Sequence, residues 1–260
     1  HANVLRGITY RVAMILGPVF GGILVSVLVS QHAFFVIGAM YVIGTLYILR
    51  INEPPFTRNL AKSSFTKDLR DGLRTVWEMP WVGALIATTS VQLIFFLAIE
   101  SVLLPVITKR EFHTNSVMAL ALAAFAVGGS ISSIVSLKMK PKHPGRVAVV
   151  VWGILVVGFF AVAFPINREF IIACFFIAGF SIGPWDAFWA SAIQQEVPVE
   201  KQGRVFAIDQ MGSLGLAPVG MALVGPITSI TGERNFILFS IAFHLFICGI
   251  TLLVPGVAKL

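Results

Sequence analysis

Apolar runs of 18 residues or more recur along almost the whole chain, and they constrain its fold more than any other feature. About 20 consecutive apolar residues in a helix, rising 1.5 Å per residue, cross the hydrocarbon core of a bilayer. The sequence is 57% hydrophobic and only 12% charged, whereas soluble domains carry about 25% charged residues. Because no stretch between the runs is long enough for a soluble domain, we expect an all-α polytopic membrane protein.

We expect about eight transmembrane helices, joined by mostly short connections. Their expected ranges are 7–29, 32–49, 81–107, 114–137, 147–166, 170–193, 205–230 and 236–254. The longest connection lies between the second and third spans. Within it, one helical face carries five apolar side chains, namely Phe65, Leu69, Leu73, Val76 and Trp77. Lys67, Arg70 and Arg74 lie on other faces, so we predict an amphipathic helix on a membrane surface, with a polybasic lipid- or calmodulin-binding switch as the alternative.

The distribution of Lys and Arg predicts how the spans are oriented. With a cytoplasmic N-terminus, fifteen of the 19 basic residues fall on the cytoplasmic side, and only Lys109, Arg110, Arg168 and Arg234 fall outside. The positive-inside rule therefore favours this orientation, with both ends of the chain cytoplasmic. The net charge of +7 then reflects basic cytoplasmic loops, and we expect a lipid bilayer and no nucleic acid as partner.

The first span contains an unusual cluster of glycine and proline, formed by Gly17, Pro18, Gly21 and Gly22. Pro18 removes a backbone donor and bends the helix. The glycines leave one face almost bare, which lets a second helix approach closely in lipid. The cluster is either a functional motif or an ordinary small-residue packing face.

The sequence resembles the major facilitator superfamily of transporters. The segment GPVFGG (residues 17–22), after an upstream glycine, is similar to the antiporter motif of that family's fifth membrane helix. The segment Gly183–Gly220 resembles the tenth-to-eleventh helix region of the macrolide-efflux and enterobactin-exporter-like branch. The basic loop KMKPKHPGR (Lys138–Arg146) lacks the aspartate usual in the corresponding loop of the family.

The resemblance implies a major-facilitator-type bundle of which this chain contains helices five to twelve. Residues 1–50 would then be the last two helices of the N-terminal half, 51–80 the cytoplasmic central loop, and 81–260 the C-terminal six-helix half. The first four helices would be missing, so we expect the 260 residues alone not to transport. In the family the Gly17–Gly22 helix meets the fourth span across the interface between halves, where this chain carries Gly128 and Gly129.

The function implied is proton-coupled efflux of hydrophobic or amphiphilic compounds by alternating access. The expected partners are a small-molecule substrate and protons, the expected location is the plasma membrane, and the full-length form would be a monomer. The alternatives are a siderophore or metabolite exporter, a uniporter, or a non-transporting membrane scaffold. The export direction and the proton coupling rest on the resemblance and on the Gly17–Gly22 motif.

Polar side chains concentrate in the third, sixth and seventh spans, which we therefore expect to line a central cavity. The candidate substrate-cavity residues are Gln92, Phe96, Trp185, Phe188, Trp189 and Gln210. The fifth span is apolar on all sides and the eighth is nearly so, apart from His244, and we expect both to face lipid. His244 is predicted to be a hydrogen-bonded packing residue.

Two carboxylic acids inside spans are candidates for proton coupling. Asp186 lies near the middle of the sixth span, where a lipid-facing charge costs at least about 2.5–3.5 kcal/mol. It must face protein or water, and it either binds protons or caps a kink after Gly183 and Pro184. Glu100 lies toward the outer third of the third span, where it either takes up protons or snorkels to the interface.

Three charged residues near the cytoplasmic helix ends are candidates for gating contacts: Arg11, Arg204 and Asp209. The alternative for Arg204 and Asp209, which lie about one turn apart, is a local structural ion pair. Arg11 is otherwise a simple cytoplasmic anchor. A gating contact would form and break as the transporter changes the side of the membrane to which it is open, whereas a structural ion pair or an anchor would stay unchanged.

The chain carries no motif of a known catalytic constellation. It has no GxSxG elbow, HExxH helix, P-loop or dinucleotide fingerprint, and its two cysteines have no metal-ligand spacing. We therefore expect neither an enzyme nor a cofactor or metal site. Without a P-loop, the energy for transport must come from an ion gradient or from another subunit.

Overall fold

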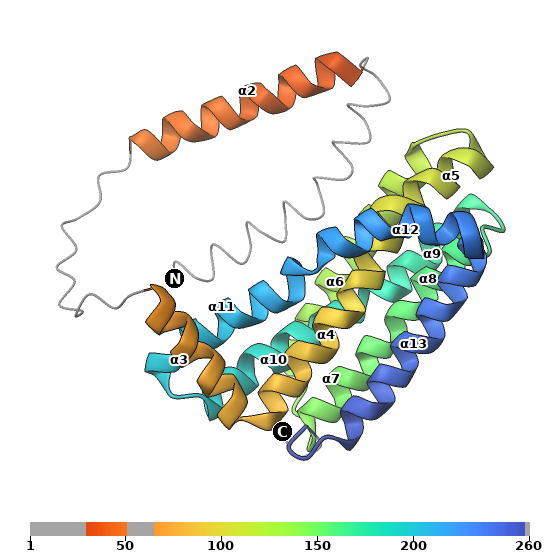
Figure 1. The fold of residues 1–260 in the computed structure, drawn as a ribbon. Coiled ribbons are helices and arrows are strands. Elements are labelled where there is room, and N and C mark those ends of the chain that lie inside the picture. Colours follow the sequence, from red (N-terminus) through yellow and green to blue (C-terminus); the bar gives the residue numbers. More distant parts are fainter. Residues whose placement is uncertain (1–29, 51–64, 258–260) are drawn as a thin grey trace.

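The computed structural model describes residues 30–50 and 65–257, and every regular element in these ranges is a helix (Figure 1). Within them, six helical segments are long and apolar enough to cross a membrane: Pro80–Phe112, Ser116–Lys138, Pro144–Ala163, Arg168–Glu196, Val199–Thr231 and Glu233–Leu253. They confirm the third to eighth expected spans. The first expected span lies outside the described residues.

Most of these segments contain an irregular step that divides them into two helices. The first comprises α4 (Pro80–Ala98), a π-helical turn η1 (Ile99–Leu103) and α5 (Leu104–Phe112). After α6 (Ser116–Lys138), the third joins α7 (Pro144–Trp152) to α8 (Val156–Ala163) through η2 (Gly153–Leu155). The remaining elements are α9 (Arg168–Gly179), α10 (Ile182–Glu196), α11 (Val199–Gly215), α12 (Ala217–Thr231) and α13 (Glu233–Leu253).

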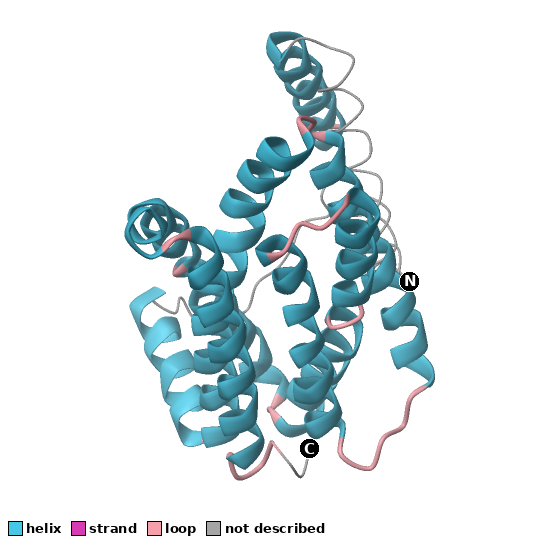
Figure 2. Ribbon diagram, turned by 90° about the vertical axis from the view of Figure 1, so that its right-hand side faces the viewer, coloured by secondary structure: helices cyan, strands magenta, loops and turns pink. Residues whose placement is uncertain are grey.

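Local sequence explains several of the helix starts. Proline occupies one of the first two positions of α4 and α7, where its missing N–H costs no intrahelical hydrogen bond. The side chain of Asn167 caps α9, because its Oδ1 accepts a hydrogen bond from the Phe170 amide at 2.7 Å. Figure 2 shows the helices of the bundle side by side, with short loops at their ends.

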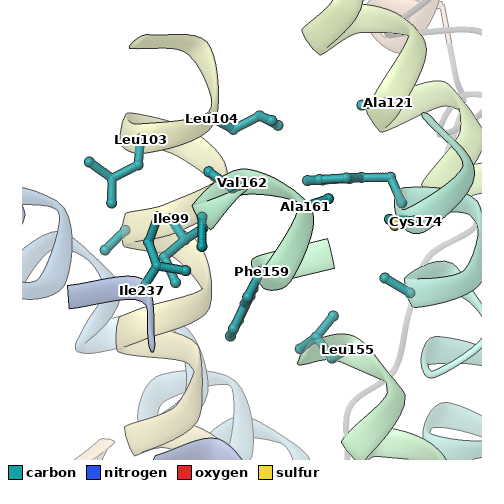
Figure 3. Close-up of a cluster of buried hydrophobic side chains, with 14 of the residues drawn as sticks. Ile99, Leu103, Leu104, Ala121, Leu155, Phe159, Ala161, Val162, Cys174 and Ile237 are labelled. Atoms are coloured by element: carbon teal, nitrogen blue, oxygen red, sulfur yellow. The ribbon is translucent and has the colours of Figure 1, made fainter. Parts of the chain in front are cut away.

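The main apolar core lies between α4–α5, α6, α8, α9 and α13 (Figure 3). Ile99, Leu104, Ile171 and Ile237 are each at most 1% exposed. The α7–α8 span does not simply face lipid, as its composition suggested, because Trp152, Leu155, Phe159 and other residues of one face are buried. Val150 and Phe160 on the same span remain exposed, so only part of it faces outward.

The closest helix contact in the bundle joins α6 to α9 and α10 through small residues. A Cβ atom on Gly128 would collide with the Phe176 carbonyl oxygen, and one on Gly179 would lie 2.9 Å from the Gly129 amide nitrogen. Gly183 fits against Ser132 in the same way, and its amide donates a hydrogen bond to Ser132 Oγ at 3.1 Å. Close backbone approach of this kind requires residues without bulky side chains.

Gly128 and Gly129 have close packing partners among the described helices. Both glycines are buried against α9 and α10. Small residues show that a helix packs closely, but they do not specify which helix it packs against. The expected partners Gly17, Pro18, Gly21 and Gly22 lie outside the described residues.

The predicted amphipathic helix is present as α3 (Phe65–Glu78), and it packs against α11. Gly72 lets the two helices approach, since a Cβ there would lie 3.2 Å from Ile208. Leu69 and Val76 join a second apolar cluster built on α4, α10 and α11, whereas Leu73 and Trp77 remain exposed. The helix therefore lies at one end of the bundle, called here the α3 end (Figure 1). Part of its apolar face is left uncovered, since Leu73 and Trp77 are exposed.

The second expected span corresponds to α2 (Ser30–Leu49). It lies apart from the six-span bundle in Figure 1, and its described side chains are exposed, including Phe34, Tyr41 and Leu49. A helix that is apolar on all sides belongs in lipid or against other helices.

Candidate functional site

A cavity of about 350 Å³ opens between α7 and α10 at the α3 end of the bundle. Three large rings of α10, those of Trp185, Phe188 and Trp189, line one side. Ala148 and Val149 of α7 line another. Polar groups are also present, because Lys140, Gln195 and Glu196 line the same space. The volume lies within the range of ligand sites, about 300–1,000 Å³.

Trp189 is held in place by two neighbouring helices. Its indole Nε1 donates a hydrogen bond to Asp209 Oδ2 of α11 at 3.0 Å. Its ring stands edge-on to that of Trp81 of α4, with centroids 6.1 Å apart and planes at 78°. Asp209 also accepts a hydrogen bond from Ser213 Oγ at 3.1 Å, which orients the carboxylate.

Trp185 rests on a second, deeply buried tryptophan. Its ring lies 4.9 Å from that of Trp152, with the planes inclined by 30°. Trp152 is 4% exposed, and its Nε1 donates a hydrogen bond to Gln92 Oε1 at 3.0 Å. The position of Trp185 in the cavity wall thus depends on the hydrogen bond between Trp152 and Gln92, which lies deeper inside the bundle.

Gln92 cross-links three spans. Its Nε2 donates to the His244 carbonyl oxygen at 3.2 Å and to Cys248 Sγ at 3.4 Å, both on α13. His244 is 2% exposed, and its Nε2 lies 3.1 Å from the Trp152 carbonyl oxygen. His244 therefore has the packing environment that the sequence predicted.

The position of Gln92 corrects its predicted place on a substrate cavity. It is 3% exposed, lies inside the helix packing and does not line the 350 Å³ cavity. The physical reason is that a buried amide must satisfy both its donors and its acceptor. Gln92 finds those partners on α7 and α13.

Phe96 and Glu100 lie in a second aromatic environment. Together with Phe125, Phe159 and Phe175 they line a narrow space of about 10 Å³ between α4, α6, α8 and α9. The Phe96 ring is 6.1 Å from those of Phe125 and Phe159. Phe96 thus belongs to a packed ring cluster and does not line the cavity between α7 and α10.

Glu100 belongs to the π-helical turn η1, and it is partly buried. Turns of this kind are rare and are often found at functional sites. Among the described residues that line this small phenylalanine-walled space, Glu100 is the acidic one.

Asp186 lies on α10 with the tryptophans but not on the wall that they form. It is exposed and does not line the cavity. Helical geometry explains the separation, since each residue turns about 100° from the last. Gln210 is also exposed and lies away from the cavity, on α11.

The predicted gating residues Arg204 and Asp209 have different partners. Arg204 Nη1 lies 3.7 Å from Asp71 Oδ2 of α3, whereas Asp209 binds Trp189 and Ser213. A second ion pair joins the same helices, with Lys201 Nζ 3.9 Å from Glu78 Oε2. The side chains of both ion pairs are partly exposed. The neighbouring Arg74 guanidinium donates a hydrogen bond to Glu78 at 2.8 Å and thereby lowers the pKa of the Glu78 carboxyl. Arg11 lies outside the described residues.

Several residues of this arrangement were not singled out in the sequence: Trp81, Trp152, Asp71, Lys140 and Glu196. Trp152 offered a usable signal, because it is the only side chain with a strong hydrogen-bond donor in the apolar span 147–166. A buried indole N–H usually finds an acceptor, so a polar partner such as Gln92 was to be expected. The other four depend on tertiary proximity.

Comparison with known proteins identifies relatives over most of the chain. The Major Facilitator Superfamily model matches residues 1–221. The protein named multidrug efflux pump Tap of Mycolicibacterium fortuitum is 26% identical over 240 residues, covering 89% of this chain and 58% of the relative. Tap of Mycobacterium tuberculosis (strain ATCC 25618 / H37Rv) is 23% identical over 232 residues, covering 85% of this chain and 54% of the relative. The chain therefore spans a little over half the length of these curated relatives.

The family match agrees with the architecture described above. The six apolar helical segments form an all-α bundle, as expected for a polytopic membrane protein. The match covers the glycine and proline cluster of residues 17–22 and all of Gly183–Gly220, the two segments on which the resemblance was based. The chain belongs to the Major Facilitator Superfamily.

Proposed function

We propose that this protein is a secondary active transporter that exports hydrophobic or amphiphilic small molecules. The observation that carries the proposal is the cavity between α7 and α10, in which Trp185, Phe188 and Trp189 form an apolar wall with polar groups nearby. The family and the relatives named as multidrug efflux pumps support the same function. A transporter of this kind binds its substrate without chemically changing it.

We propose alternating access as the mechanism and a proton gradient as its energy source. Asp186 and Glu100 are the candidate proton carriers. Asp186 is an exposed carboxylate on an apolar span, a position that is costly against lipid and therefore belongs against protein or water. Glu100 is placed in the π-helical turn beside four phenylalanine rings, where loss of its charge on protonation relieves a large solvation cost.

The ion pairs between α3 and α11 are our candidates for a gating contact. Arg204–Asp71 and Lys201–Glu78 tie a membrane span to the segment that would connect the two halves of the full-length protein. Exposed pairs contribute only about 0–1 kcal/mol each. A contact this weak exchanges easily, which suits a gate better than it suits a structural support.

We also propose that the α3 end faces the cytoplasm of a plasma-membrane protein, with both ends of the chain on that side. Most basic residues of the described helices and connections lie at this end, and the positive-inside rule supports the assignment (Figure 1). They are Lys67, Arg70, Arg74, Lys138, Lys140, Lys142, Arg146, Lys201 and Arg204. In this proposal residues 1–50, 51–80 and 81–260 are the end of one half, the central loop and the second half of a monomer.

Everted membrane vesicles carrying the complete protein test the proposal. A lipophilic dye should be concentrated inside the vesicles when a proton gradient is imposed, and it should be released when an ionophore collapses the gradient. Asp186→Asn and Glu100→Gln should each be compared with the parent protein. Dye transport at the same rate with and without the proton gradient would indicate a uniporter. The absence of dye transport by correctly inserted protein would favour a scaffold.

A further inference from the structure

We propose that the cavity between α7 and α10 is a binding slot for planar aromatic amphiphiles. This inference rests on the proposed function and deepens it by naming a substrate class. Its basis is the set of side chains that line the cavity and the way in which its rings are held in place. The family match and the names of the relatives do not specify either.

The two facing sides of the cavity differ in the size of their side chains. On α10, Trp185 and Trp189 lie four residues apart and Phe188 lies between them, so three rings share one helical face. On α7, the facing residues are the small Ala148 and Val149. A flat ring system that enters the cavity can stack on these rings and meets only small side chains of α7.

The ring-lined side is fixed before any ligand arrives. Trp189 is held by its hydrogen bond to Asp209 and by the edge contact with Trp81. Trp185 is held by stacking on Trp152, which is itself anchored to Gln92. Because these side chains are already ordered, a ligand loses less conformational entropy on binding. Ordered rings also favour planar over propeller-shaped compounds.

The polar residues of the cavity suit an amphiphile rather than a purely apolar compound. Lys140 precedes α7, and Gln195 and Glu196 end α10, so all three lie toward the α3 end of the space. They carry one positive charge, one negative charge and one neutral amide. A ligand polar group of either sign therefore finds a partner, and shape should dominate selectivity over charge.

Fluorescence anisotropy of ethidium, a planar aromatic cation, tests the inference with the purified protein in detergent and without a proton gradient. We expect saturable binding that is displaced by other planar dyes. Tetraphenylphosphonium, which has the same charge but a non-planar shape, should compete at least about tenfold less well. Non-saturable partition of ethidium, or equal competition by tetraphenylphosphonium, would overturn the proposal.

Two variants localise the binding. Phe188→Ala removes one ring from the wall, and Ala192→Phe fills the slot, since Ala192 also lines it. Each should weaken ethidium binding about tenfold or more. Ala207→Phe, a matched change at an exposed position on α11, should leave binding unchanged. Thermal unfolding identifies any variant that has lost its fold, and unchanged binding by a folded Ala192→Phe protein would overturn the proposed site.

The two proposals fail in different ways. Ethidium binding that Ala192→Phe abolishes, in a protein whose vesicles show no gradient-driven efflux, would refute the proposed function and support the slot. Gradient-driven efflux of ethidium that Ala192→Phe leaves unchanged would support the function and refute the slot.

Discussion

The indole N–H of Trp189 on α10 donates a hydrogen bond to the Asp209 carboxylate on α11 at 3.0 Å. This bond joins a wall residue of the cavity to the residue predicted for gating. It gives Asp209 a positioning role: the carboxylate orients Trp189 and is itself oriented by Ser213.

Substitution of Asp209 separates this positioning role from a role that needs its charge. Asp209→Ala leaves the Trp189 N–H without its acceptor, and we expect a loss of stability of about 1–3 kcal/mol together with weaker dye binding. Asp209→Asn keeps an acceptor oxygen, so it should retain most of the stability and binding. Thermal unfolding in detergent and ethidium anisotropy measure both effects. If Asp209→Asn were as damaging as Asp209→Ala in both measurements, the charge would be the essential property.

Gln92 should be essential for stability although it lies away from the cavity. Gln92→Leu removes the acceptor of the Trp152 N–H and two donor contacts to α13, leaving a buried donor unsatisfied. We expect a loss of about 1–3 kcal/mol, seen as a lower unfolding temperature. Gln194→Leu, the same change at an exposed position on α10, is the control and should have little effect. Equal stability of the two variants would show that the buried network contributes nothing.

The close contact between α6 and α9 should not tolerate a larger side chain. Gly179→Val places a Cβ against the Phe125 carbonyl oxygen and 2.9 Å from the Gly129 amide nitrogen, so the helices must separate. We expect a loss of at least about 1–3 kcal/mol, measured as aggregation in size-exclusion chromatography or as a lower unfolding temperature. Gly249→Val on α13, where a Cβ meets nothing within 4 Å, is the matched control. A monodisperse, fully stable Gly179→Val protein would contradict this packing.

The ion pair between Arg204 and Asp71 should affect transport more than stability. The side chains are 36% and 39% exposed, so breaking the pair should cost less than about 1 kcal/mol. We expect Arg204→Asp and Asp71→Arg each to change the rate of dye efflux, and the double exchange to restore part of it. Efflux rates in vesicles and unfolding in detergent distinguish the two effects. Additive losses in the double variant would show that the pair does not act as a unit.

The sequence predicted the helices well and their partners poorly. Apolar runs locate the spans because the bilayer requires a minimum length of apolar helix, and the periodicity of Leu69 and Val76 correctly predicted α3. Neither signal says which helix is the neighbour. The sequence did not predict that Gly128 packs on α9, and its predicted contact with Gly17–Gly22 involves residues outside the described ranges.

The same limit applies to the candidate site. Trp185, Phe188 and Trp189 share one helical face and line the cavity between α7 and α10. Gln92 was grouped with them because it is polar, and Phe96 because it is aromatic. Inside the bundle, however, Gln92 accepts a hydrogen bond from Trp152, and Phe96 packs against Phe125. Only the tertiary arrangement distinguishes an amide that meets a ligand from one that holds three helices together.

The bare contact between Gly128 and Gly179 limits how the protein can move. With backbone touching backbone, α6 and α9 have no layer of flexible side chains to absorb a shear, so we expect them to travel as one rigid piece together with α10. Any opening or closing of the slot must then come from displacement of α7 relative to that piece.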